Sequence, residues 1–502
     1  MLREITIIAL CGTVLFFSKL ASSQEAHKHS APEKLGRVAF ATTCKPAVQE
    51  QFERAVALLH SFAYSAAEAS FNDVAAKDPQ CAIAHWGVAM ANFHQLWEPP
   101  LTPHSLSIGR QEVLRAQEIT ARSERERGFI EALRPVFEAS AAYESRILNY
   151  ETSMQKLAEA NPDDTEAQVF YALALLAAAP SFDKTHARQK RAAEILEPLY
   201  PKYPEHPGIA HYLIHAYDNT ELASKGINVA MAYSRIASSA PHALHMPSHI
   251  FTRLGMWNDS IDSNRAAMIA AHEEGNTSEE LHAMDYLVYA YLQEGRSKEA
   301  GEVIAQLKNV QNLDQQDFIA AYASTAMLVR YAIERCDWVE AMRIAVPHGA
   351  PLHVVAVAVW ARALGSARGG HSAEAKAEID RLHQIETQLR VARNEYWANQ
   401  VKIQALEAEA WQAQAQARTY EARRLLHQAA NQEDATEKLP VTPGPIVPAR
   451  EQLGELLLEQ NHPDLAVKEF RRALISAPKR RGAVDGLARA VARAGRVERE
   501  TD

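Results

Sequence analysis

The chain has 502 residues, of which 47% are hydrophobic and 23% are charged, a composition typical of a folded protein rather than a disordered one. The 62 Asp and Glu residues outnumber the 53 Lys and Arg residues and give a formal net charge of −9, so we expect no nucleic-acid partner, which would call for a basic surplus. Four cysteines are too few for a disulfide scaffold, and the low content of glycine and aromatic residues favours helices joined by short turns.

The first 23 residues have the pattern of a secretory signal peptide. Arg3 supplies the positive charge, residues 5–17 form an apolar core, and residues 21–23 are small. That core is shorter than the roughly 18 apolar residues of a membrane helix, and no other run approaches this length. We therefore expect a periplasmic or secreted protein with no membrane span after signal removal, beginning with a polar lead-in over 24–45. A retained anchor is the alternative.

Most of the remaining chain follows a period of 34 residues. In the unit 447–480, small or apolar residues and a closing proline stand at the diagnostic positions Leu453, Gly454, Leu457, Ala466, Phe470, Ala473 and Pro478. This spacing resembles the tetratricopeptide repeat (TPR), a pair of closely packed antiparallel helices. The pattern predicts an all-α fold, a TPR-type solenoid of helical hairpins wound into a right-handed superhelix.

The repeat pattern divides the chain into segments of different regularity. We predict TPR units over 46–100, His-rich TPR units over 205–310, divergent TPR units over 311–430, and a C-terminal TPR unit with a capping helix over 449–502. Residues 101–204 are helical in pattern but have a longer spacing, so irregular helical hairpins are expected there.

A Pro-rich connection covers residues 431–448 and ends in Val-Thr-Pro-Gly-Pro-Ile-Val-Pro. Such a sequence cannot be helical throughout. In a solenoid, a loop of this kind often lies on the binding face, although a plain connector explains the composition equally well.

The spacing of two cysteines predicts a disulfide. Cys44 and Cys81 are 37 residues apart, close to one repeat, and each precedes the first helix of its unit. Equivalent ends of neighbouring first helices are adjacent in a solenoid, and an exported protein can keep a bond there. We favour this disulfide over two buried free thiols and expect Cys336 to stay free.

The 21 histidines form the main chemical signal in the sequence. When repeat units begin at residues 207 and 241, His211 shares one repeat position with His245, and His215 shares another with His249. Residues at i and i+4 lie on one helical face, so two such pairs on adjacent helices can bring four imidazoles together. Imidazole suits Zn, Cu, Fe and Ni. We therefore predict a transition-metal site formed by these four histidines.

Two acids support this predicted metal site, whereas one proline argues against its geometry. Asp218 and Asp285 stand close enough in the repeat frame to be ligands or to orient a ligand histidine. Pro247 lies between His245 and His249, where it would start a helix rather than continue one; a helix that begins there leaves His245 in the entry turn. If so, packing and hydrogen bonding are the alternative role of these histidines.

A second candidate cluster lies near the N-terminus and consists of His60, His85, His94, Trp86 and Trp97. His60 and His94 are 34 residues apart and close the first helices of two units. A shared role at the helix ends is the simpler interpretation, because His favours helix C-termini. A binding role beside the two tryptophans is the alternative.

Several stretches resemble a group of exported bacterial TPR proteins more closely than they match the general repeat. They are residues 58–62 (LLHSF), 81–87 (CAIAHWG), 211–218 (HYLIHAYD), 245–255 (HMPSHIFTRLG) and 441–445 (VTPGP). In that group a His often precedes the proline of the last motif, whereas this chain has Leu439. The resemblance implies that the repeat places holding His206, His242, His282 and Tyr289 belong to the ligand-binding concave groove.

The function that follows is an exported TPR scaffold whose His-lined groove binds a transition metal or a metal-linked ligand. One alternative is a periplasmic scaffold that binds a peptide or protein partner in the groove without metal, and another is a metal-dependent enzyme of unknown reaction. The sequence has no His-Glu-Xxx-Xxx-His, no phosphate loop and no dinucleotide fingerprint. This lack of catalytic motifs favours a binding protein over an enzyme.

Overall fold

The computed structural model describes residues 33–96, 101–119, 121–310 and 313–501. The predicted signal peptide, the start of the lead-in and Trp97 lie outside these residues. From Lys34 onward the chain forms one unit, Lys34–Asp502, in which every described regular element is a helix. Among the described residues, none of the helices combines the length and apolar character needed to cross a membrane.

The first part of this unit precedes the His-rich repeats. Its helices are α1 (Gln49–His60), α2 (Tyr64–Lys77), α3 (Ala82–Ala91), α4 (Pro103–Ile119), α5 (Glu124–Leu133), α6 (Tyr143–Ala160), α7 (Thr165–Ala177) and α8 (Ala187–Leu196). Local sequence sets their limits. The side chain of Asp164, for example, accepts hydrogen bonds from the backbone N–H groups of Glu166 and Ala167 and so begins α7.

The His-rich part of the unit follows. Its helices are α9 (Pro207–Tyr217), α10 (Ile227–Ile236), α11 (Pro241–His245), α12 (Pro247–Arg253), α13 (Trp257–Glu274), α14 (Thr277–Gln293) and α15 (Ser297–Gln306). Prolines stand at the first position of α9, α11 and α12, where a missing N–H costs no helical hydrogen bond. Gly255 and Gly295 adopt positive φ angles of 64° and 73° in the turns that follow α12 and α14.

The last part contains α16 (Phe318–Glu334), α17 (Trp338–Met342), α18 (Leu352–Arg368), α19 (Ser372–Val391), α20 (Glu395–Ala415), α21 (Thr419–Asp434), α22 (Ala449–Glu459), α23 (Pro463–Ser476) and α24 (Arg481–Thr501). Short 3-10 turns, η1 (Pro46–Val48), η2 (Arg134–Phe137), η3 (Ala223–Gly226) and η4 (Leu307–Asn309), join or extend helices along the unit.

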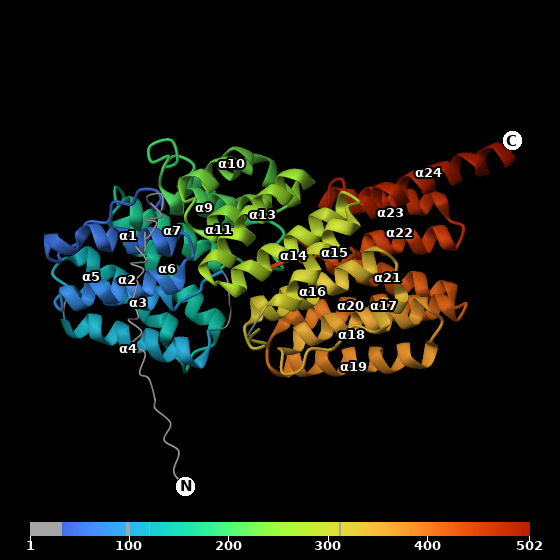
Figure 1. The fold of residues 1–502 in the computed structure, drawn as a ribbon, viewed down its shortest axis with the longest axis horizontal. Helices are drawn as coiled ribbons and strands as arrows, with labels where there is room; N and C mark the ends of the chain where they lie inside the picture. The colour runs from blue at the N-terminus through green and yellow to red at the C-terminus, as the bar shows by residue number, and fades with distance from the viewer. Residues whose placement is uncertain (1–32, 97–100, 120, 311–312, 502) are drawn as a thin grey trace, which may run out of the picture. The chain divides into compact units, whose positions relative to one another are not determined.

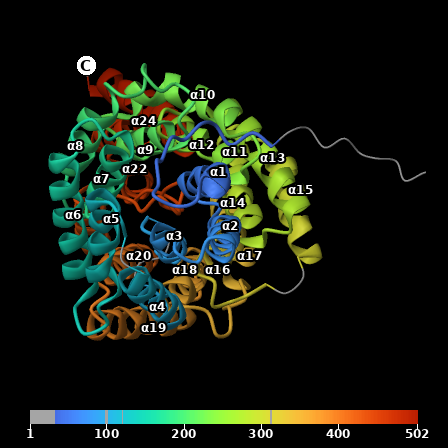
Figure 2. The same ribbon diagram turned by 90° about the vertical axis from the view of Figure 1, so that its left-hand side faces the viewer.

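The helices stack as hairpins, which makes the fold an all-α solenoid of TPR type. Partners within a hairpin pack together, as in α13 with α14, α20 with α21 and α22 with α23. Inner helices of successive hairpins also pack on one another, as in α14 with α16, α16 with α18 and α18 with α20. Figure 1 shows the hairpins of Lys34–Asp502 following one another along the chain, and Figure 2 shows the same helices from the side.

Close helix contact depends on glycine at the expected repeat position. A Cβ atom at Gly454 in α22 would lie 2.7 Å from the ring of Phe470 in α23, closer than van der Waals contact permits. Gly87 in α3 instead packs on Phe71 of the preceding hairpin, with the corresponding distance at 2.3 Å. Glycine thus permits close contact with the repeat's phenylalanine both within a hairpin and between hairpins.

The cysteine pair expected from the repeat spacing is bonded. Cys44 and Cys81 form a disulfide with their Cα atoms 4.8 Å apart, and it ties the segment before α1 to the start of α3. Cys336 is free and exposed. A bridge closing a loop of this length typically stabilises a fold by about 2–4 kcal/mol.

The Pro-rich connection has a different extent and a more specific path than its composition indicates. Residues 431–434 still belong to α21, so the non-helical segment is 435–448. This segment lies against the inner helices: the Tyr286 hydroxyl of α14 donates to the carbonyl oxygen of Pro440 (3.0 Å), and the Arg330 guanidinium of α16 donates to that of Gly444 (2.9 Å). It therefore lies on the concave face and is not a plain connector.

Candidate metal centre

The clustered histidines come from four inner helices of the His-rich repeats. α9 carries His211 and His215, α11 carries His242 and His245, α12 carries His249, and α14 carries His282. The break at Pro247 does not separate the second pair, because Met246 keeps helical φ and ψ angles of −52° and −35° between α11 and α12. His245 thus ends one helix rather than lying in an open entry turn.

One cluster, the first triad, consists of His211, His215 and His242. The Nε2 atom of His211 lies 3.1 Å from Nε2 of His215 and 3.2 Å from Nε2 of His242. One ring nitrogen from each residue lies within 4.8 Å of the other two. All three side chains are buried, so the triad is an internal cluster.

The neighbouring cluster, the second triad, consists of His245, His249 and His282. The Nε2 atoms of His245 and His249 are 3.0 Å apart, and the rings of His245 and His282 have centroids 4.3 Å apart. Ring nitrogens of the three again lie within 4.8 Å of one another, and all three residues are buried. The predicted site of His211, His215, His245 and His249 is therefore replaced by two triads, because a third histidine from the following repeat completes each pair.

Acceptors on the far side of the rings fix the protonation of the first triad. Nδ1–H of His211 donates to the carbonyl oxygen of His60 (2.6 Å), which has no proton to give. Nδ1–H of His242 donates to the Glu279 carboxylate (3.2 Å). In the neutral rings, both Nε2 atoms then carry lone pairs and no proton.

The second triad is fixed in the same way. Nδ1–H of His245 donates to Oδ1 of Asn264 (2.7 Å), and the Asn264 amide is oriented by its own donation to the carbonyl oxygen of Ser260 (2.7 Å). Nδ1–H of His249 donates to the Asp218 carboxylate (2.9 Å). The Nε2 atoms of His245 and His249 are therefore also bare lone pairs.

In these tautomers the Nε2 lone pairs of His245 and His249 face each other at 3.0 Å, and those of His211 and His242 at 3.2 Å, an arrangement that a cation between them would stabilise. Protonation of a ring would also stabilise it, but it is opposed here. Burial lowers the pKa of His211 and His245 well below its ordinary value, and it lowers that of His249 to about 4. Burial therefore keeps the rings of His211, His245 and His249 neutral at pH 7.

Asp218 and Asp285, the two acids predicted to assist a metal, differ in their surroundings. Burial by itself would raise the pKa of Asp218, but the nearby charges of Lys438 and Arg253 outweigh it and hold that pKa well below its usual range. Asp218 therefore stays ionised and orients His249. Asp285 differs from its predicted role beside the metal: it forms a buried ion pair with Arg330, 3.0 Å away, and is already neutralised within the chain.

Two other predicted groove residues also have structural contacts. The Tyr289 hydroxyl accepts a hydrogen bond from Arg480 (3.3 Å), and its ring packs edge-on against Trp257. His206 caps α9 through Nδ1, which accepts from the backbone N–H of Ile209 (3.2 Å). Neither residue belongs to the triads.

The N-terminal candidate cluster does not come together as one site. His60 does not have the helix-end role predicted for it and His94. Its side chain contacts the Glu166 carboxylate (2.9 Å) and the Tyr212 hydroxyl (2.9 Å) instead of capping α1. Nε2–H of His94, in contrast, donates to the carbonyl oxygen of Ala91 at the end of α3 (3.1 Å).

The rest of this group is divided between an ion pair and the hydrophobic core. His85 contacts Glu112 (2.6 Å), and Trp86 is buried against the rings of Phe40 and Phe129. Trp97 lies outside the described residues. His60, Glu166 and His206 form a further close group. Oε2 of the Glu166 carboxylate contacts the ring of His60, and Oε1 contacts the ring of His206, each at 2.9 Å. Here a carboxylate already occupies the position between the imidazoles.

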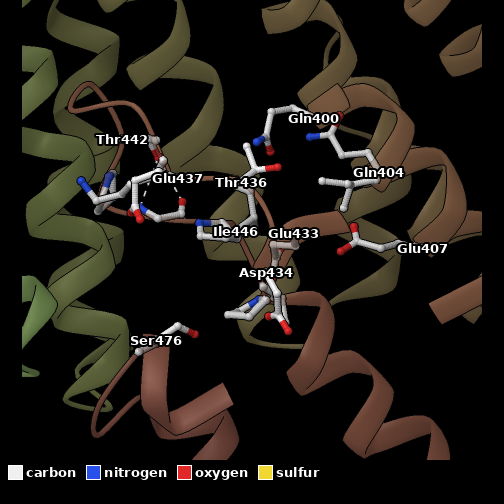
Figure 3. A pocket seen from close by; sticks show the side chains of 18 of the residues that line it. Gln400, Gln404, Glu407, Glu433, Asp434, Thr436, Glu437, Thr442, Ile446 and Ser476 are labelled. Atoms are coloured by element: carbon white, nitrogen blue, oxygen red, sulfur yellow. Dashed lines mark hydrogen bonds between the residues drawn. The ribbon is translucent and has the colours of Figure 1, made fainter. Parts of the chain in front are cut away.

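The open part of the concave face lies beside the triads and is not lined by their rings. A cavity of about 430 Å³ runs between the inner faces of α18 and α20 and the segment 435–448. Figure 3 shows Gln404 and Glu407 on one side of it and Thr442 on the other. The predicted His-lined groove is therefore corrected: the histidines are packed inside the repeat, and the chain's own segment covers much of the inner face.

Apart from Asp218, sequence reasoning did not identify the residues that orient the triads. Glu279, Asn264 and the backbone of His60 come from α14, α13 and α1, and Lys438 reaches Asp218 (2.9 Å) across 220 residues of sequence. No spacing rule joins them to the histidines. Only the position of Glu279, three residues before His282 in the same helix, offers a local signal.

No known family model matches the sequence, and no curated protein is similar to it. Among solved structures, the Cut9–Hcn1 assembly of the APC/C is similar over 90% of this chain and 77% of that one, at 12% identity and a TM-score of 0.37. Yeast Tom70 covers 88% of both chains at 10% identity with a TM-score of 0.35. These likenesses are weak, and the hairpin stacking of the chain itself defines the fold.

Proposed function

We propose that this protein binds transition-metal ions at its two buried histidine triads. The observation that carries the proposal is the pair of facing Nε2 atoms at the heart of each triad, His211 with His242 (3.2 Å) and His245 with His249 (3.0 Å). A metal ion removes the repulsion between such lone pairs without placing a proton charge on a buried ring. A folded chain that brings these nitrogens together in pairs at 3.0–3.2 Å is suited to bind a cation.

The distances suit coordination by nitrogen. Zinc–nitrogen bonds of 2.0–2.1 Å at tetrahedral angles place ligand nitrogens about 3.3 Å apart, and the observed Nε2 separations are 3.0–3.2 Å. The donor set is imidazole only, which favours Zn, Cu, Fe or Ni over the oxygen-seeking ions Mg and Ca. Three protein ligands also leave an open coordination position.

The contacts behind the triads are those that a metal site requires. A metal-bound histidine usually donates its other N–H to a carboxylate or carbonyl group, which fixes the ring and makes it a better donor. Glu279 and the His60 carbonyl group do this in the first triad, and Asp218 and Asn264 do so in the second.

A periplasmic or secreted location is part of the same proposal. Its support is the signal-like sequence of residues 1–23 and the Cys44–Cys81 disulfide, a bond that persists in oxidising compartments. Secretion into culture fluid or periplasm, tested by N-terminal sequencing of the exported protein, should yield a chain starting near Gln24.

Metal uptake by the purified protein tests the proposal. We expect the metal-free protein to take up Zn²⁺ or Cu²⁺ in titration, and His215→Ala combined with His249→Ala to abolish the uptake while the helical circular-dichroism spectrum is retained. His383→Ala is the matched control, because its side chain is 45% exposed and contacts Glu409 on the surface. A wild-type protein that is isolated without metal and takes none up contradicts the proposal.

Binding of a peptide or protein partner is the second candidate, and the solenoid is compatible with it. The observation that bears on it is the segment 435–448, which already occupies part of the concave face through Tyr286 and Arg330. The space that remains, about 430 Å³, suits a small molecule or a single side chain better than an extended peptide. A partner on this face would therefore have to displace the segment.

A further inference from the structure

We infer that the two triads form one paired, buried centre that holds two transition-metal ions as close neighbours. This inference rests on the proposed function. Ring contacts cross the boundary between the triads: His215 and His249 have centroids 5.9 Å apart, and His242 and His245 have centroids 6.1 Å apart.

The pairing follows from the repeat. Each triad takes an i, i+4 pair from one inner helix and one histidine near the start of the next inner helix: His242 completes the first triad and His282 the second. The second triad is thus a copy of the first, moved by one step of the solenoid. Adjacent packed helices have axes 8–10 Å apart, so two ions related by one step lie at about that separation.

The ring geometry gives an independent upper limit. An ion bound to Nε2 at 2.0–2.1 Å lies about 3.2 Å from the centroid of the imidazole ring. With the rings of His215 and His249 5.9 Å apart between centroids, the two ions are at most about 12 Å apart.

The residues of the next repeat explain why the histidine triad is repeated only once. The next inner helix, α14, has Asp285 and Tyr289 where α9 and α11–α12 have their histidine pairs. Arg330 supplies the cation for Asp285, at 3.0 Å, so a third triad is replaced by an ion pair within the chain. The centre therefore holds two ions and no more.

The two positions differ in counter-charge. In the first triad, His242 contacts the Glu279 carboxylate (3.2 Å), and no ion pair to Glu279 other than that with His242 is found among the described residues. In the second, Asp218 is already paired with Arg253 (2.8 Å) and Lys438 (2.9 Å), so less negative charge is left for an ion. The first triad should fill first.

Repulsion between the ions adds to this order. Two dications about 10 Å apart repel strongly enough, even with the dielectric constant of water, to weaken the second binding step roughly tenfold or more. Imidazole ligands are neutral and do nothing to offset the charge. Occupancy of one triad is thus coupled to occupancy of the other.

Titration of the metal-free protein with Cu²⁺, followed by electron paramagnetic resonance (EPR), tests the pairing. We expect two ions per chain, bound in two steps at least tenfold apart in affinity, and a dipolar-broadened spectrum that develops during the second step. His249→Ala should keep the tight step and give one ion with a narrow spectrum. His215→Ala should lose the tight step, and His383→Ala should behave as wild type.

The outcomes separate the inference from the proposed function. Two bound ions with an unbroadened spectrum at full occupancy overturn the pairing but leave metal binding intact. The same conclusion follows if the wild type binds one ion and each single variant loses it. No uptake of copper at all overturns the proposed function itself. Because the wild-type spectrum alone decides whether the ions are neighbours, the test does not depend on the variants folding.

Discussion

Two stretches of the inner face handle buried charge in opposite ways. Around α14 and α16 the chain supplies its own cation, as when Arg330 neutralises Asp285 at 3.0 Å and donates to the segment 435–448. Around α9, α11 and α12, Arg253 and Lys438 pair with Asp218, but the Nε2 atoms of His211 and His242 face each other at 3.2 Å. The same repeat position thus carries a completed ion pair in one region and an incomplete cluster of imidazoles in the next. Two facing acceptors are costly to bury without a cation, so the incomplete region is where a ligand is expected.

The largest effect should come from breaking the completed pair. Arg330→Met leaves Asp285 buried and without the cation that pairs with it, and we expect the free energy of unfolding to fall by about 3–5 kcal/mol. Chemical denaturation of the variant and the wild type measures this loss. Arg335→Met, at the partly exposed end of the same helix, should cost less than about 1 kcal/mol. Equal losses in both variants would contradict the comparison.

The next effect should come from completing the incomplete region. An ion that binds only the folded state at one hundred times its dissociation constant stabilises that state by about 2.7 kcal/mol. We expect Zn²⁺ or Cu²⁺ to raise the melting temperature of the metal-free protein and a chelator to reverse the rise. The His215→Ala, His249→Ala double variant should show no rise, while His383→Ala should show the full one.

The sequence predicted the solenoid well because a 34-residue period with glycine and phenylalanine at set positions is a local pattern. It also predicted which histidines share a face, since i and i+4 spacing determines that directly. It did not predict that His242 and His282 complete separate triads, because this depends on how close neighbouring helices pack. Nor could spacing link Asp285 to Arg330, 45 residues away.

The path of the Pro-rich segment was equally beyond the sequence. Proline and glycine exclude a helix there, but they do not say that Lys438 reaches Asp218 or that Glu437 reaches Arg253. These long-range ion pairs fix the segment on the concave face. The difference between the predicted His-lined groove and the buried triads has the same origin, because burial is a property of the whole stack.

A smaller effect should come from weakening one orienting contact. Asp218→Asn removes the carboxylate behind His249 and also the partner of Arg253 and Lys438, and we expect metal affinity at the second triad to fall by about 10- to 100-fold. The first triad should be unaffected. Competition titration with a chromogenic chelator measures the two affinities, and Asp262→Asn on the exposed face of α13 is the control. Loss of both sites would show that Asp218 acts on the fold instead.

The smallest effect concerns the pH dependence of two acids on α20 and α21. Glu433 lies beside Glu407 at the cavity; burial raises the pKa of Glu433 to about 8, and burial together with the charge of Glu433 raises that of Glu407. The folded state therefore binds more protons than the unfolded state between pH 4.5 and 8, and stability should fall as the pH rises through this window.

Glu433→Gln keeps an oxygen that can accept from the backbone N–H of Ala449 but does not ionise. We expect it to be more stable than wild type by about 1 kcal/mol at pH 8 and equal to it near pH 4. Thermal melts of both proteins across this range, with Glu421→Gln as the surface control on the same helix, measure the difference. A constant offset at every pH would mean that the substitution acts through packing, whereas a gap that opens only with rising pH identifies the raised pKa of Glu433 as its cause.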